Sequence, residues 1–165
     1  MKNLWAPWRK EFILGPREEG CIFCKLAKKK DDRNNLILYR GRHNYIILNR
    51  YPYNNGHLMV VPNRHVPNLA SMEPAELAEL MRLTRRAEMA LNEAYTPQGI
   101  NVGINLGRPA GAGILDHVHV HLVPRWNGDT NFLSVVGNTR VVPEEMGETA
   151  RRLRPVFERL LRERD

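Results

Sequence analysis

The stretch His117-Val118-His119-Val120-His121-Leu122-Val123 has a histidine at every second position and valines between them. Alternate residues of a β-strand face the same side, so the pattern predicts a strand over 117–124 with the histidines on one face and the valines buried. Three polar side chains on one face need partners, which points to a site and not to a core. His117 and His121 would lie about 13 Å apart, too far to share one small ion.

The rest of the chain predicts a sheet with helices. Turn signals separate four further strands, over residues 36–40, 45–50, 57–62 and 100–106. Apolar residues at helical spacing predict a long helix over 74–95 and a short one over 22–29. A last helix could open at Pro143, with a kink at Pro155. We expect an α+β fold: a five-stranded antiparallel meander, a long covering helix and a C-terminal helix.

Length and composition are those of an ordinary globular protein. The chain has 165 residues, 42% hydrophobic and 26% charged, which fits one domain over 1–165, with an N-terminal arm (1–20) and a C-terminal helical extension (143–165). Its net charge of +7 favours anionic partners. It has no apolar run of membrane-spanning length, no secretory signal and only two cysteines, so we expect a cytoplasmic protein.

The two cysteines, Cys21 and Cys24, form a C-x-x-C pair. Such a pair supplies two soft ligands from one turn, and a tetrahedral zinc site needs two more. Histidines would have to complete the site, and His65 and His117 are the candidates. The alternatives are a chance pairing and a redox role, which is less attractive because no parallel-sheet pattern follows the motif.

The middle histidine, His119, is the natural nucleophile of the three. Neutral imidazole is well populated at pH 7 and attacks phosphorus to give a reactive N-linked adduct, which an acceptor then discharges. Flanking imidazoles and the amides of the glycine-rich loop over 107–116 could stabilise charge on the phosphate oxygens. This chemistry needs an anionic substrate, which the positive charge of the chain would attract.

These motifs resemble those of the histidine-triad (HIT) family. HVHVHLV (117–123) is similar to its signature, and ILNRYPYNNGHLMVVP (47–62) is similar to its nucleotide-binding strand pair. The likeness covers about residues 21–132. NLGRPAGAGILDHVHVHLVPRWNGDTNF (105–132), with WAPWR (5–9), most resembles the bacterial diadenosine tetraphosphate phosphorylases. His121 excludes the galactose-1-phosphate uridylyltransferase-like branch, which has glutamine there.

The resemblance implies a HIT-like fold and a role for each matching residue. His119 matches the nucleophile that becomes nucleotidylated, His121 a histidine that contacts phosphate oxygens, and His57 one that supports the triad from the neighbouring strand. Asn49 matches the ribose-binding position and Asn105 a position beside the phosphates. The resemblance further implies homodimers formed by strand addition, and a structural zinc ion whose ligands match Cys21, Cys24, His65 and His117.

The loop before the triad departs from the family pattern. Many relatives have glutamine and serine or threonine where this chain has Gly113 and Ile114, which argues against a simple hydrolase or phosphoramidase. A loop with Arg108, Gly111 and Gly113 could instead bind phosphate through a guanidinium and backbone amides. Such an extra anion pocket would suit inorganic phosphate as a second substrate.

The main hypothesis is therefore phosphorolysis of diadenosine tetraphosphate to ATP and ADP through a nucleotidyl-histidine. One alternative is hydrolysis of adenosine phosphoramidate or of a dinucleoside polyphosphate. The other is a non-catalytic zinc module that binds a nucleotide or RNA. We expect a nucleoside polyphosphate or dinucleoside polyphosphate substrate, a homodimer, and neither a membrane nor nucleic acid as partner.

Overall fold

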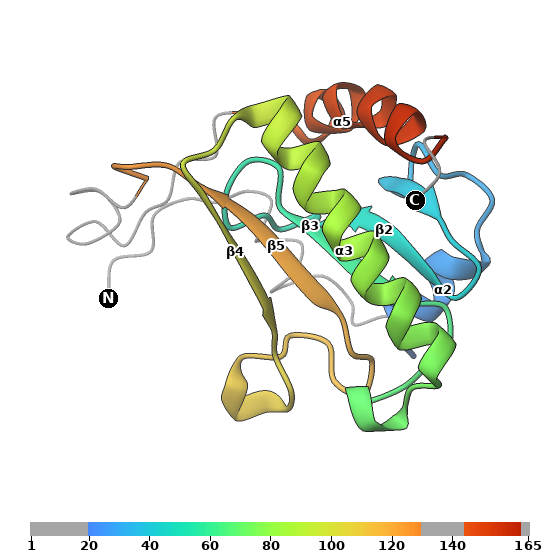
Figure 1. Cartoon of the computed structure of the whole chain (residues 1–165). Helices are drawn as coiled ribbons and strands as arrows, with labels where there is room; N and C mark the ends of the chain where they lie inside the picture. The colour runs from blue at the N-terminus through green and yellow to red at the C-terminus, as the bar shows by residue number, and fades with distance from the viewer. Residues whose placement is uncertain (1–19, 130–143, 163–165) are drawn as a thin grey trace.

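The computed structural model describes residues 20–129 and 144–162, and its strands form one five-stranded antiparallel sheet in the order β1-β2-β3-β5-β4 (Figure 1). The strands are β1 (Ile37–Arg40), β2 (Asn44–Leu48), β3 (Leu58–Pro62), β4 (Gly99–Ile104) and β5 (Val120–Arg125). The α+β prediction is confirmed, but only β1 to β3 follow one another as a meander. The chain then crosses to β4 at the far edge, and β5 returns between β3 and β4.

Two helices cover one face of the sheet. The helix α3 (Pro74–Tyr95) has the predicted bounds and begins with proline in its first turn. A capping box between Glu73 and Glu76 stabilises its N-terminus. The helix α5 (Met146–Leu160) packs beside it and accommodates Pro155 without ending. The predicted start at Pro143 lies outside the described residues. The main core lies between these helices and residues such as Ile46, Leu58, Val60 and Leu122.

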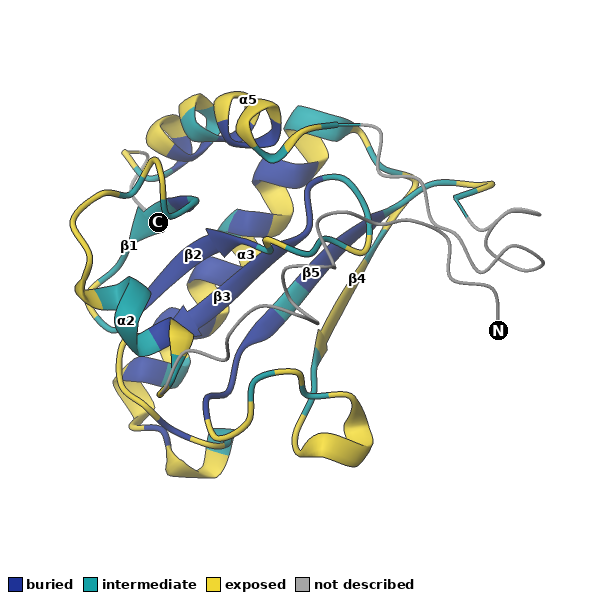
Figure 2. Ribbon diagram, turned by 180° about the vertical axis from the view of Figure 1, so that it is seen from behind, coloured by how far each residue is buried: buried dark blue, intermediate teal, exposed yellow. Residues whose placement is uncertain are grey.

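The short helix α2 (Ile22–Lys28) packs on the opposite face of the sheet, over β1, β2 and β3. Its residue Phe23 is buried against Tyr45, Ile47 and Met59 in a second core. The hydroxyl of Tyr45 donates a hydrogen bond of 3.0 Å to the carbonyl of Phe23, which fixes the helix to β2. Figure 2 shows this face, with β2 and β3 buried and β4 largely exposed.

The strand β5 begins at Val120, three residues later than predicted. Its ladder to β3 cannot run further because Pro62 has no N–H group, and the carbonyl of Pro62 accepts a 2.9 Å hydrogen bond from the ring of His117. The prediction that Val118 and Val120 are buried is confirmed, but His117 and His119 are buried as well. Since Phe23 of α2 lies against both rings, the histidine face is covered there.

None of the helices among residues 20–129 and 144–162 has an apolar stretch of the length that crossing a membrane requires.

Candidate functional site

Four predicted metal ligands converge at the N-terminus of α2. One ligand atom from each of Cys21, Cys24, His65 and His117 lies within 4.8 Å of every other. The Nδ1 atom of His117 is 3.2 Å from Sγ of Cys21 and 3.3 Å from Nδ1 of His65, and Nδ1 of His65 is 3.4 Å from Sγ of Cys24. Four donors of this type at this spacing could hold a metal ion.

The hydrogen bonds of His117 explain which of its nitrogens faces this cluster. Its Nε2–H donates to the carbonyl of Pro62 at 2.9 Å, so the lone pair is on Nδ1, among the other three ligand atoms. Burial raises the pKa of the Cys24 thiol, and the neighbouring Cys21 raises it further. A bound cation would act in the opposite direction and favour the thiolates.

The next histidine, His119, has the opposite arrangement. Its Nδ1–H donates to the carbonyl of His117 at 2.9 Å, which leaves the lone pair on Nε2. The ring is buried, and burial lowers its pKa, so the neutral form dominates at neutral pH. A neutral imidazole with a fixed tautomer and a bare Nε2 is arranged as a nucleophile.

A chain of hydrogen bonds also assigns the tautomer of His121. The backbone N–H of Tyr53 donates to Nδ1 of His57 at 3.1 Å, so the proton of His57 is on Nε2. That proton is donated to Nδ1 of His121 at 2.9 Å, so His121 carries its own proton on Nε2. His121 therefore offers an N–H donor beside the ring of His119, whose centroid is 4.6 Å away. Such a donor can stabilise negative charge on a phosphate oxygen.

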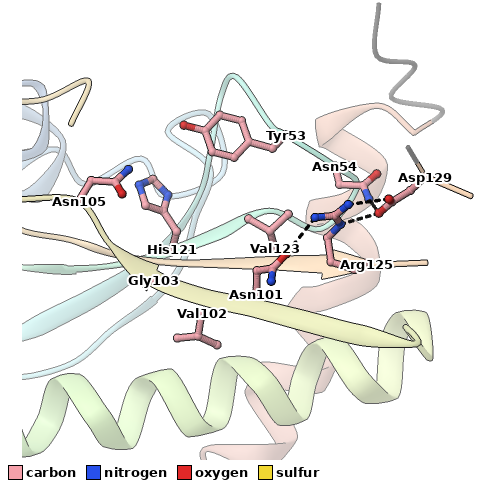
Figure 3. A pocket seen from close by; sticks show the side chains of 10 residues that line it. All are labelled: Tyr53, Asn54, Asn101, Val102, Gly103, Asn105, His121, Val123, Arg125 and Asp129. Carbon is pink, nitrogen blue, oxygen red and sulfur yellow. Dashed lines mark hydrogen bonds and ion pairs between the residues drawn. The ribbon is translucent and has the colours of Figure 1, made fainter. Parts of the chain in front are cut away.

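The substrate-binding residues expected from the sequence fall into two groups. Asn49 lies beside His57, with its Nδ2 3.3 Å from the ring, and Asn105 lines the same pocket as His121 (Figure 3). Arg108 lies on the short helix η2 (Arg108–Ala110), in the exposed loop after β4. Gly111 accepts a long 3.5 Å hydrogen bond from Asn105, whereas Arg108 and Gly113 make no hydrogen bond to a histidine among the described residues.

Two aromatic residues that the sequence analysis did not select lie against the histidines. The ring of Phe23 lies edge-on to His119 and His117, at centroid distances of 4.9 and 5.4 Å. The ring of Tyr53 is 4.6 Å from that of His57 and stacks on His121 at 6.1 Å. The position of Phe23 inside the C-x-x-C pair was not a sufficient signal, because Ile22 lies between the same two cysteines and is exposed.

The chain is similar to several known proteins. The model of the HIT domain matches residues 30–128. The AP-4-A phosphorylase of Mycobacterium tuberculosis is 38% identical over 162 residues, 93% of this chain and 83% of that protein. The asymmetrical bis(5'-nucleosyl)-tetraphosphatase of Schizosaccharomyces pombe is 33% identical over 93 residues, 56% of this chain and 50% of that protein. A zinc-bound histidine triad family protein of Mycobacterium smegmatis, known from a crystal structure, superposes with a TM-score of 0.69 at 29% identity, covering 87% of this chain and 96% of that one.

Proposed function

This chain belongs to the HIT domain family, and we propose that it phosphorolyses diadenosine tetraphosphate to ATP and ADP through a nucleotidyl group held on His119. It is a nucleotide-processing enzyme of that family. The observation that carries the proposal is the tautomer of His119: the 2.9 Å hydrogen bond to the carbonyl of His117 occupies Nδ1 and leaves Nε2 as the nucleophilic atom. The 38% identity to an AP-4-A phosphorylase supports the substrate.

In the first half of the reaction, Nε2 of His119 attacks the α-phosphorus. The N–P bond forms, the bond to the bridging oxygen breaks, and ATP leaves with the bonding electrons. The ring of the adduct gains positive charge, which the carbonyl of His117 stabilises through Nδ1–H. The Nε2–H of His121 is available to the phosphate oxygens during the attack.

In the second half, inorganic phosphate takes the adenylyl group. A phosphate oxygen attacks the phosphorus, the N–P bond breaks, and its electrons return to Nε2 of His119 as ADP forms. In this proposal Asn49 holds the ribose and Asn105 contacts the phosphates. The contact of Asn49 with His57, and the pocket that Asn105 shares with His121, support these roles. The exposed loop with Arg108, Gly111 and Gly113 is the proposed binding site for the incoming phosphate, through backbone amides and the guanidinium.

The metal is proposed to be a structural zinc ion held by Cys21, Cys24, His65 and His117. Two thiolates and two imidazole nitrogens are a zinc-type donor set, and four protein ligands leave no position for substrate. When bound, the ion supplies a cross-link between α2 and the segment before β5. The bond-making steps above need only the side chains of this chain.

A homodimer that pairs through β4 is part of the proposal. This strand is at the edge of the sheet. Val102, at its middle, faces the same side of the sheet as α3 but is 51% exposed. An exposed apolar edge strand favours pairing with another strand. Val102→Lys should therefore give a monomer in analytical ultracentrifugation, whereas Leu115→Lys, at an exposed apolar position outside β4, should not. A wild-type protein that sediments as a monomer at all concentrations would contradict this part of the proposal.

The reaction is tested by incubating the protein with diadenosine tetraphosphate, with and without phosphate. Phosphorolysis predicts ATP and ADP only when phosphate is present. AMP and ATP formed at the same rate without phosphate would instead identify a hydrolase, the activity named for the Schizosaccharomyces pombe relative. Mass spectrometry after acid-free quenching should detect one AMP on the wild type and none on His119→Ala, with His43→Ala as the matched control. Unimpaired turnover by His119→Ala would rule out the nucleotidyl-histidine.

A further inference from the structure

A pocket of about 220 Å³ lies on the sheet face away from α3, beside His121. Its floor is Asn101 and Gly103 of β4 and His121 of β5, and its wall is Tyr53 and Asn54 from the segment between β2 and β3 (Figure 3). Val102, between the two floor residues, points the other way, toward α3. The volume is below the roughly 300–1,000 Å³ of pockets that enclose a whole ligand, so this pocket fits a part of one.

The polar groups of the pocket are held in place by a network. The guanidinium of Arg125 forms two bonds to the carboxylate of Asp129, at 2.6 and 2.7 Å. Asp129 also accepts hydrogen bonds from the side chain of Asn54 and the backbone of Trp126. Arg125 in turn donates to Oδ1 of Asn101 at 2.9 Å, so the amide of Asn101 is oriented with its Nδ2 group as the remaining donor. The charges are paired, and the pocket presents amide and aromatic surface instead of a free ion.

The pocket and the ribose-binding position lie on opposite flanks of His121. In the sheet order β2-β3-β5-β4, Asn49 directly follows β2 and Asn101 is on β4, while His121 is on β5 between them. A molecule that extends from Asn49 across the ring of His121 therefore reaches this pocket with its other end. Tyr53 is 43% exposed, and its ring stacks on that of His121, so its aromatic surface lies where the far end would arrive.

We propose that this pocket binds the second nucleoside of the dinucleoside polyphosphate, the one that leaves as ATP. The proposal rests on the proposed function and adds a recognition element to it. Aromatic surface is suited to stacking a base, and an oriented amide N–H is suited to a purine ring nitrogen. The pocket would then explain a preference for substrates with two nucleosides over those with one.

The test compares diadenosine tetraphosphate with adenosine 5'-tetraphosphate, which has the same phosphate chain and lacks the second nucleoside. Gly103→Val fills the floor of the pocket, because a Cβ at this glycine meets no atom within 4 Å and a β-branched residue suits a strand. Gly99→Val is the matched control, since Gly99 is on the same strand with equally open space and does not line the pocket. Asn101→Ala removes the donor without adding volume.

We expect the wild type and Gly99→Val to favour the dinucleotide in kcat/KM by about tenfold or more, the range that base stacking supplies. In Gly103→Val this preference should disappear, and in Asn101→Ala it should fall severalfold, mostly through KM. Equal use of both compounds by the wild type, or an equal loss on both in Gly103→Val, would overturn the proposal. If Gly103→Val does not fold, as judged by its thermal melt, Asn101→Ala decides in the same way.

Binding separates this proposal from the proposed function. If the wild type turns over neither compound, the proposed reaction is wrong, but calorimetric titration still measures whether the dinucleotide binds at least tenfold more tightly than adenosine tetraphosphate. That preference, present in Gly99→Val and absent in Gly103→Val, would support the subsite on its own. Equal affinities of the wild type for both compounds would reject it.

Discussion

The ring of Phe23 lies edge-on against the imidazole of His119, with centroids 4.9 Å apart and planes at 62°. Phe23 sits between the two cysteines of the metal cluster, and its carbonyl is held by Tyr45. The imidazole of His119 cannot rotate toward Phe23 without displacing α2. The contact therefore links the metal cluster to the proposed nucleophile through one side chain.

Replacing Phe23 with leucine should lower kcat and leave the metal in place. An edge-on aromatic pair contributes about 0.5–1.5 kcal/mol, so we expect a loss of up to about tenfold in kcat with little change in KM. Phe157→Leu is the control, since Phe157 is also fully buried but belongs to the core under α5. Equal losses of kcat in both variants would mean that only general packing was damaged. The metal content of both proteins is measured alongside.

Loss of one ligand of the metal cluster should remove the metal and destabilise α2. Cys24→Ser and His65→Ala should each hold well under one zinc ion per chain by atomic emission, and both should melt at a lower temperature than the wild type. The control is His43→Ala, which removes a histidine that lies outside the cluster. Wild-type protein prepared without chelator that contains no metal, or a Cys24→Ser variant with an unchanged melt, would contradict a structural metal.

The turn between β1 and β2 depends on a buried carboxylate from α3. Glu79 accepts hydrogen bonds from the backbone N–H groups of Arg42, His43 and Asn44, at 2.6–2.9 Å. In Glu79→Gln, one oxygen becomes an amino group that faces N–H donors, so we expect a loss of about 2–4 kcal/mol in the free energy of unfolding. Urea titration measures this, with Glu88→Gln, at an exposed position of the same helix, as control. A loss below about 0.5 kcal/mol would mean that the turn does not need this anchor.

Local sequence patterns were sufficient to predict those features that depend on residues close together in the sequence. The helical spacing and the proline at the start predicted α3 with its observed bounds, and the alternating valines predicted which residues beside the triad are buried. The pair Cys21 and Cys24 predicted a cluster with His65 and His117, which the fold brings to within 4.8 Å. In that case the ligand chemistry restricted the partners to very few histidines.

Other features depend on contacts that no local pattern encodes. The start of β5 depends on Pro62, a residue 55 positions before His117. Pro62 has no N–H group for the ladder, and its carbonyl accepts a hydrogen bond from the ring of His117. The tautomer of His121 depends on the backbone of Tyr53, through His57. The orientation of Asn101 depends on Arg125, and the pairing of β4 with β5 is needed to bring them together. These are tertiary effects, so the sequence could suggest the participants but not their arrangement.

Two histidines of the site, His57 and His121, should make the protein less stable in acid. Burial, with smaller contributions from His121 and His119, lowers the pKa of His57 to about 3, and burial followed by His119 lowers the pKa of His121 to about 4. In the unfolded chain both would titrate near about 6.5. Between these values the unfolded state binds more protons than the folded state, so the free energy of unfolding falls as pH falls below about 6.5.

At pH 5, each such histidine should cost about 2 kcal/mol of stability relative to pH 7.5. His57→Gln removes one of the two and keeps a side chain that can donate to His121. Its loss between pH 7.5 and 5, measured by urea unfolding, should therefore be smaller than that of the wild type by about 2 kcal/mol. Metal analysis of both proteins at both pH values separates this effect from the release of the ion, which would act on both alike. If the free energy of unfolding of the two proteins changes in parallel with pH at equal metal content, His57 is protonated in the folded state as readily as in the unfolded chain. In that case the hydrogen bond from His57 to His121 does not assign the tautomer of His121.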